Sequence, residues 1–154
     1  MTRLRRGRGP RAVGPALLLL AALAACAGAP EPAYAPLIVR DLAALGRDTD
    51  ALLADVAAAP AAYPDRRTAY DGLADRAGTV TDRAIARTPA GRTDADLRAT
   101  VAAMTDYRRN LSALERADAA GGLDVHTLAR RRIVLADILR DAQVYEGAVL
   151  ARGR

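Results

Sequence analysis

The chain has 154 residues, which is enough for one domain of ordinary size, and its formal net charge is +5. Its pI of about 10.1 is typical of nucleic-acid-binding proteins, but the positive charge is concentrated in one segment. Of the 23 basic residues, all of them arginine, five fall within residues 1–11, and the other 18 balance the 18 acidic residues. We therefore expect no nucleic-acid partner.

The first 25 residues have the order of a secretory signal peptide. An arginine-rich start is followed by an apolar stretch over residues 16–25, which ends in small side chains. This stretch is about ten residues long, whereas a membrane-spanning helix needs about 20. We therefore interpret residues 1–25 as an export signal that is removed from the mature protein.

The end of this segment carries a short motif of one aliphatic residue, two small residues and a cysteine. Leu23, Ala24 and Ala25 precede Cys26, which is the only cysteine in the chain. This order resembles the lipobox of bacterial lipoproteins. The resemblance implies that the Cys26 sulfur receives a diacylglyceryl group, that cleavage occurs before this residue, and that the lipid anchors the chain in a membrane. An uncleaved anchor and an ordinary cleaved signal are the alternatives.

The residue after the cysteine bears on location. Ala27, rather than aspartate, follows Cys26, and in Gram-negative sorting this resembles an outer-membrane address. The resemblance therefore implies a protein of the bacterial cell envelope that is lipid-anchored, at the outer membrane, and faces the periplasm.

Residues 26–36 are expected to form a tether between the lipid and a folded domain. They contain three prolines, and proline at this density favours an extended, solvated chain. At about 3.1 Å per residue, such a tether holds the domain roughly 30 Å from the lipid.

The rest of the chain is helical by its apolar periodicity, and no strand pattern competes. Residues 37–58 and 65–88 place apolar side chains three or four residues apart, and prolines separate the two runs. A third helix follows the capping pair Thr93 and Asp96, and a fourth follows Asp124. The positions predicted to be buried are Ile38, Leu42, Leu45, Thr49, Leu52 and Val56; Tyr70, Leu73, Ala77, Val80 and Ala84; Leu97, Val101, Met104, Tyr107, Leu111 and Leu114; and Leu128, Leu135, Leu139, Ala142 and Val149.

Four helices of similar length joined by short turns favour one architecture. We predict an all-α fold, an antiparallel up-down four-helix bundle over residues 37–152. Two long helical hairpins completed by dimerisation are the alternative. The second helix has few large aliphatic residues and contains Gly72 and Gly78, so we expect it to be the least stable helix or to pack closely through its small residues.

The residue inventory argues against the chemistries that helical bundles commonly carry. The chain lacks the paired E-x-x-H motifs of di-iron sites and the C-x-x-C-H motif of covalently bound haem. His126 is the only histidine and cannot complete a four-ligand zinc site. Ser112 is the only serine and lies within a predicted helix, away from any nucleophile elbow. We therefore expect no catalytic residue, no metal ligand and no cofactor.

The last helix carries more aliphatic residues than one buried face can use. On a helical wheel, Ile133 and Val144 fall on the side opposite the predicted core positions, near Asp137 and Arg140. Aliphatic side chains within a polar rim are typical of protein–protein contacts. Two scattered exposed aliphatic residues are the alternative, and they need no functional explanation.

These observations predict a non-enzymatic docking or assembly component of the cell envelope. We expect Ile133, Asp137, Arg140 and Val144 to form the contact with an envelope protein partner, and a homo-oligomer is a further option. The alternative function is a carrier or sensor that holds a small apolar ligand between its helices.

Overall fold

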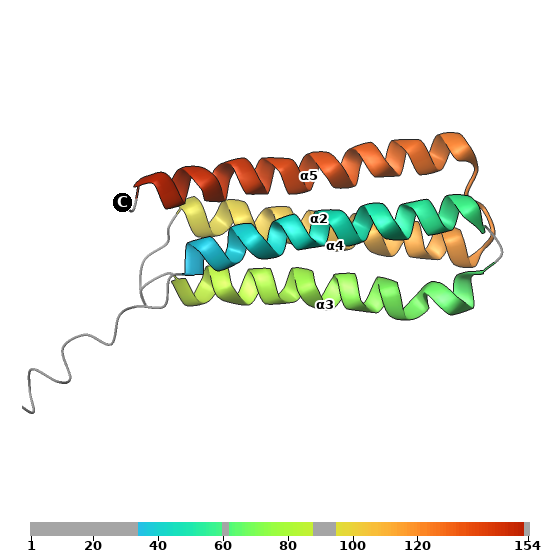
Figure 1. Ribbon diagram of the computed structural model, residues 1–154, viewed down its shortest axis with the longest axis horizontal. Helices are drawn as coiled ribbons and strands as arrows, with labels where there is room; N and C mark the ends of the chain where they lie inside the picture. The colour runs from blue at the N-terminus through green and yellow to red at the C-terminus, as the bar shows by residue number, and fades with distance from the viewer. Residues whose placement is uncertain (1–33, 60–61, 88–94, 153–154) are drawn as a thin grey trace, which may run out of the picture. The chain divides into compact units, whose positions relative to one another are not determined.

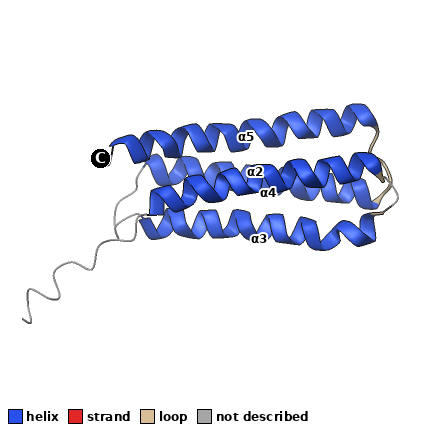
Figure 2. Ribbon diagram, in the orientation of Figure 1, coloured by secondary structure: helices blue, strands red, loops and turns tan. Residues whose placement is uncertain are grey.

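The computed structural model describes residues 34–59, 62–87 and 95–152, with the side chains of Asp96, Leu97 and Arg152 left aside. All regular secondary structure in these ranges is helical, as Figure 2 shows. The helices are α2 (Tyr34–Ala58), α3 (Tyr63–Arg87), α4 (Ala95–Ala119) and α5 (Val125–Arg152).

The four helices form a closed antiparallel bundle, which confirms the predicted fold class. Consecutive helices run in opposite directions (Figure 1). Helices α2 and α4 each pack against both α3 and α5, so α3 and α5 lie diagonally across the bundle. Because α2 and α5 pack together within one chain, the bundle is complete without a second copy, and the dimerised-hairpin alternative is not needed.

The core follows the predicted periodicity closely. Every predicted position of α2 and α3 is buried, and so are Met104, Tyr107, Leu111, Leu114, Leu135, Leu139 and Ala142 in the other two helices. Val101, Leu128 and Val149 are only partly buried. Each of these three lies within two turns of a helix end, where fewer neighbouring side chains cover it.

Two helices begin earlier than their periodicity indicates. Helix α2 starts at Tyr34 rather than at residue 37, so residues 34–36 belong to the helix and not to the tether. Helix α3 starts at Tyr63, two residues before the predicted start. Each early start places a proline in the first helical turn, where proline is tolerated because the N–H groups there have no acceptor within the helix.

The turn between α4 and α5 is encoded locally. Gly121 has a φ of 65°, and the N–H groups of Gly121 and Gly122 donate to the carbonyls of Asp118 and Ala117 at 2.9 Å each. This is the Schellman pattern that satisfies the last carbonyls of a helix. Asp124 then caps α5, since its Oδ1 accepts the N–H groups of His126 and Thr127 at 2.8 Å each.

The small residues of α3 divide into two kinds. Ala77 and Ala84 are fully buried, so α3 does contact its neighbours through small side chains. Gly72 and Gly78 do not contribute to this packing, because a Cβ atom at either would meet nothing within 4 Å. The expectation of close packing is therefore wrong for the two glycines.

Several predictions concern residues outside the described ranges. They include the export signal over residues 1–25, the lipobox at residues 23–26, residues 26–33 of the tether, and the cap at Thr93. In the described part of the chain, no helix combines the length and the apolar character that crossing a membrane requires.

Candidate functional site

Helix α5 presents a partly apolar face to solvent, away from α2 and α4. Among the described residues, five large hydrophobic side chains are exposed, and four of these belong to α5. Two of these four are Ile133, 61% exposed, and Val144, 70% exposed. The wheel-based prediction that these two aliphatic residues avoid the core is thus confirmed.

Six residues define this surface, which we call the outer face of α5. At about 100° per residue they fall within an arc of roughly 100° on the side opposite Leu135 and Leu139. Helix α5 forms one edge of the bundle in Figure 1. Five of the six residues are exposed, and Asp137 is of intermediate burial. The residues are Ala129, Ile133, Asp137, Arg140, Val144 and Ala148.

The charged residues of the outer face pair with each other. Arg140 Nη2 donates to Asp137 Oδ1 at 2.7 Å, and the two side chains are 67% and 48% exposed. An ion pair this exposed contributes little to folding stability. The structure thus brings all four predicted contact residues onto one face, where Ile133, Arg140 and Val144 are exposed and the Asp137 side chain is about half exposed.

A buried polar cluster lies near the α2–α3 turn, and sequence analysis missed it. The Arg66 guanidinium donates twice to the Asp118 carboxylate, from Nε to Oδ2 at 3.1 Å and from Nη2 to Oδ1 at 2.6 Å. Arg66 also donates to the Ala59 carbonyl at 2.6 Å, and the Tyr70 hydroxyl donates to Asp118 Oδ2 at 3.1 Å. A buried charged pair is tolerated only when its hydrogen bonds are satisfied in this way.

The electrostatics of this cluster fix its protonation states. The hydrogen bonds to Asp118 raise the pKa of Arg66 above the ordinary arginine value. Burial raises the pKa of Tyr70, and the negative charge of Asp118 adds to the effect. On the rim, the Tyr63 hydroxyl donates to Glu115 Oε1 at 3.0 Å, and this bond raises the pKa of Tyr63. The tyrosines therefore stay neutral and Arg66 stays charged near neutral pH, which suits a structural role.

A second buried carboxylate lies toward the opposite end of the bundle. Glu146 on α5 is fully buried, and it accepts hydrogen bonds from the Thr100 hydroxyl and the Arg87 guanidinium. Helix α3 thus supplies one arginine near each of its ends, and each pairs with a carboxylate on another helix.

These buried polar residues continue the apolar seams, which is the signal that could have located them. Arg66 lies four residues before Tyr70, and Asp118 lies four residues after Leu114. In the same way, Glu146 lies four residues after Ala142, and Thr100 lies four residues before Met104. Seam position therefore predicts their burial, although their polar side chains argue against it.

Thr49, the polar interruption in the first seam, is explained by a bond across the core. Its hydroxyl donates to the Leu45 carbonyl at 2.7 Å. The Tyr107 hydroxyl lies 2.6 Å from Thr49 Oγ1 and donates to it, because the only proton of Thr49 is already committed. Burial raises the pKa of Tyr107 to about 12.

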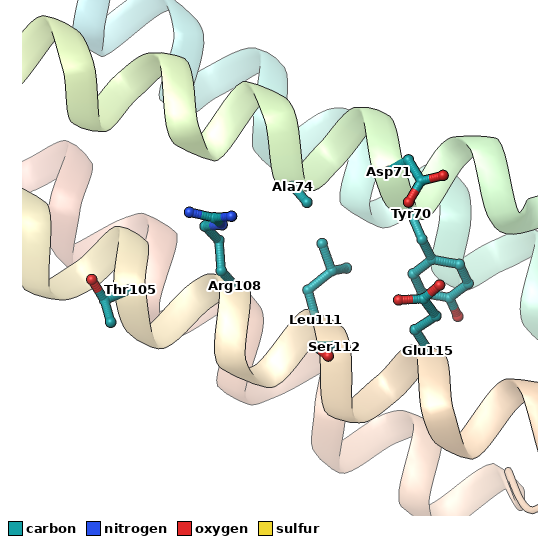
Figure 3. Close-up of a pocket in the computed structure, with 8 residues that line it drawn as sticks. All are labelled: Tyr70, Asp71, Ala74, Thr105, Arg108, Leu111, Ser112 and Glu115. Atoms are coloured by element: carbon teal, nitrogen blue, oxygen red, sulfur yellow. The ribbon is translucent and has the colours of Figure 1, made fainter.

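Surface grooves lie on both sides of α3. The groove between α3 and α4 has a volume of about 380 Å³ and includes Tyr70, Leu111, Ser112 and Arg108 in its lining. Figure 3 shows the Arg108 guanidinium between the two helices, with Leu111 and Ala74 directed toward each other beside it. Ser112 accepts a hydrogen bond from Arg116 at 2.9 Å, an arrangement that does not activate a serine as a nucleophile.

The groove between α2 and α3 has a volume of about 410 Å³ and is more apolar. Leu52 and Leu73 are in its lining, and an ion pair between Asp48 and Arg76 spans its edge. Gly72 is also in its lining and leaves open space there, because a Cβ atom at this position would meet nothing within 4 Å.

The described ranges hold no group of three histidine, cysteine or acidic side chains placed to bind a metal ion. His126 is exposed in the first turn of α5. Comparison of the chain with protein-family models, curated proteins and solved structures finds no significant match.

Proposed function

We propose that this chain is a lipid-anchored, non-enzymatic docking or assembly component of the bacterial cell envelope, and that the outer face of α5 is its contact surface. The observation that carries the proposal is the concentration of exposed aliphatic side chains on α5. Ile133 and Val144 flank a charged pair, so the face has an apolar part and a polar part, as protein interfaces do.

The anchor in this proposal rests on the resemblance of Leu23, Ala24, Ala25 and Cys26 to a lipobox. Lipidation at Cys26 would hold the bundle at the periplasmic face of the outer membrane, where envelope proteins are its available partners. Two or three acyl chains give stable anchoring, whereas one chain binds only marginally.

Membrane fractionation of a Cys26→Ser variant tests the anchor. We expect the wild-type chain in the membrane fraction after a high-salt wash and the variant in the soluble fraction or as an unprocessed precursor. An Ala27→Ser variant serves as the matched control and should fractionate like the wild type. Retention of the processed Cys26→Ser variant in the membrane would refute lipid anchoring.

Site-specific photocrosslinking in native membranes tests the contact surface. A photoreactive residue at position 133 or 144 should give one adduct of discrete mass. The same residue at position 85 is the matched control, because Ile85 is an exposed aliphatic residue of α3 at 52% exposure. No adduct from α5, or the same adducts from all three positions, would exclude the outer face of α5 as the contact.

The groove between α2 and α3 favours the second candidate function, a carrier or sensor of a small apolar ligand. Its lining includes Leu52 and Leu73, and Gly72 leaves room for a guest. Under this alternative, a lipid or quinone raises the melting temperature of the wild-type chain and not of a Gly72→Leu variant, whose side chain fills the groove. Equal melting temperatures with and without these compounds would rule against it.

A further inference from the structure

We infer that the outer face of α5 binds a second copy of this chain, with the two α5 helices antiparallel and related by a two-fold axis. This inference rests on the contact surface of the proposed function and names its occupant. It follows from the order and spacing of the residues along α5, from their exposure, and from their charges.

The central part of the outer face has a palindromic order. Ile133, Asp137, Arg140 and Val144 are separated by intervals of four, three and four positions, and their chemical types read aliphatic, charged, charged and aliphatic from either end. Farther from the centre, Ala129 mirrors Ala148, whereas in the same arc Arg130 mirrors Gly147 and His126 mirrors Ala151. The centre of this order lies between Ile138 and Leu139, and this point is also the centre of α5.

A two-fold axis through this centre pairs the residues reciprocally. Ile133 of each copy faces Val144 of the other, and Ala129 of each copy faces Ala148 of the other. A symmetric interface requires this relation, in which residue i meets residue j and residue j meets residue i. The two helices overlap over their full length of about 42 Å, because the axis crosses the middle of α5.

The charges select the antiparallel arrangement. In the antiparallel pair, Asp137 of each copy faces Arg140 of the other, so the ion pair that each chain forms within its own α5 is joined by two ion pairs across the axis. A parallel pair in the same register places aspartate against aspartate and arginine against arginine. Juxtaposition of like charges disfavours the wrong arrangement more strongly than ion pairs stabilise the right one.

The small residues permit a close approach of the two helices. Ala129 and Ala148 are both exposed at the ends of the face, and Gly147 in the same arc has nothing within 4 Å of where a Cβ atom would lie. One helix pair buries less than the roughly 800 Å² per partner of a standard interface, so we expect a weak dimer in solution. Anchoring both copies in one membrane raises their effective concentration and favours the pair.

Paired cysteine substitutions in the membrane-anchored full chain test this register. Two differently tagged chains, one with Ile133→Cys and one with Val144→Cys, are co-expressed and the membranes are mildly oxidised. We expect a disulfide that joins the two tags. Neither variant expressed alone should form a dimer, because identical positions lie about 16 Å apart along the antiparallel helices, and a disulfide requires Cα atoms within about 7 Å.

Two controls accompany this experiment. The parent chain, with Cys26 as its only cysteine, reports any disulfide that does not involve α5. Chains with Ile85→Cys and Val144→Cys form the matched pair, since position 85 is exposed on α3 and should give no mixed disulfide.

Each outcome bears on the inference separately from the proposed function. A dimer of the Ile133→Cys chain alone overturns the antiparallel arrangement. Absence of the mixed disulfide, together with a photocrosslink from position 133 to a different protein, overturns the second copy as occupant while the docking function stands. Absence of both products overturns the inference and the docking surface together.

Exchanging the charges at positions 137 and 140 tests the pairing further. If these residues had only a structural role, the exchange would not first lower and then restore the yield of the mixed disulfide. Asp137→Arg alone should lower the yield of the mixed disulfide about tenfold, which corresponds to about 1.4 kcal/mol. Adding Arg140→Asp to the same chains exchanges both charges and should restore the yield to near the original. A yield that Asp137→Arg leaves unchanged, or that the double exchange leaves low, counts against the reciprocal ion pairs.

Discussion

Helices α3 and α5 lie diagonally across the bundle and pack against the same two neighbours, yet they differ in what holds them there. Helix α3 contains three large aliphatic residues, and only Leu73 and Val80 of these are buried. Helix α5 contains ten large aliphatic residues and leaves four of them exposed. Large aliphatic side chains are therefore scarce in α3, whereas α5 has more of them than the core buries.

Polar anchors compensate for the shortage in α3. Near its start Arg66 binds Asp118 on α4, and at its end Arg87 binds Glu146 on α5. Tyr70 adds a third bond, to the same Asp118. Helix α3 thus depends on a few buried hydrogen bonds, whereas α5 has apolar side chains beyond those that its packing uses. The contact proposed for the outer face of α5 would account for this surplus.

The largest expected effect comes from breaking the main anchor of α3. Asp118→Ala leaves the Arg66 guanidinium buried without its carboxylate, so we expect the free energy of unfolding to fall by about 3 to 5 kcal/mol. Asp137→Ala, which breaks the exposed pair on α5, should cost less than about 1 kcal/mol. Urea denaturation followed by circular dichroism measures both, and equal losses would contradict the contrast between the two helices.

The second largest effect is expected at alkaline pH, which should lower the free energy of unfolding of the bundle. The pKa of Tyr107 rises from about 10 in the unfolded chain to about 12 in the fold. Because the folded pKa is the higher one, this contribution is fully present below pH 10 and is lost as the pH rises through 12. At 1.36 kcal/mol per pKa unit, the loss is about 2 to 3 kcal/mol from Tyr107, and Tyr70 on α3 acts in the same direction.

Denaturation curves at increasing pH, recorded with the phenolate absorbance, measure this effect. Tyr107→Phe should remove its share of the pH dependence while costing about 1 kcal/mol at neutral pH, since one hydrogen bond is lost. Thr49 keeps its bond to Leu45 in this variant. If the variant and the wild type lose stability in parallel above pH 10, ionisation of Tyr107 is not the cause.

The glycines of α3 offer a smaller change in the opposite direction. Gly72→Ala and Gly78→Ala should each stabilise the bundle by up to about 1 kcal/mol, because a Cβ atom at either position meets nothing within 4 Å. Gly121→Ala is the contrasting variant and should cost about 1 to 2 kcal/mol, because Gly121 has a positive φ. A loss of stability at Gly72 or Gly78 would show that α3 needs these glycines.

Periodicity alone could predict the fold and most of the core, because the spacing of apolar residues determines which side of a helix is buried. It also predicted the exposure of Ile133 and Val144 for the same reason. The anchors Arg66, Asp118 and Glu146 could not be predicted as pairs, since their partners lie on other helices and come together only in the bundle. The palindrome on α5 could not be predicted either. Its centre coincides with the centre of the helix, and that centre is known only once the structure defines both ends of α5.

The smallest expected effect on stability comes from substitutions on the outer face of α5, which test the proposed contact without disturbing the fold. Ile133→Asp and Val144→Asp should change the free energy of unfolding by no more than about 0.5 kcal/mol, because both side chains are more than half exposed. Ile85→Asp on α3, at 52% exposure, should behave the same way and serves as the matched control.

Variants on α5 and α3 are expected to differ in association with a partner, although they do not differ in the free energy of unfolding. Ile133→Asp and Val144→Asp should abolish the photocrosslinked adduct and, by the antiparallel pairing, the α5-mediated dimer, whereas Ile85→Asp should leave both intact. A variant that keeps its unfolding free energy and loses its partner has lost a contact and not a fold. If Ile133→Asp instead unfolds the bundle, its side chain belongs to the core, and the apolar surplus of α5 disappears as an argument for a second contact.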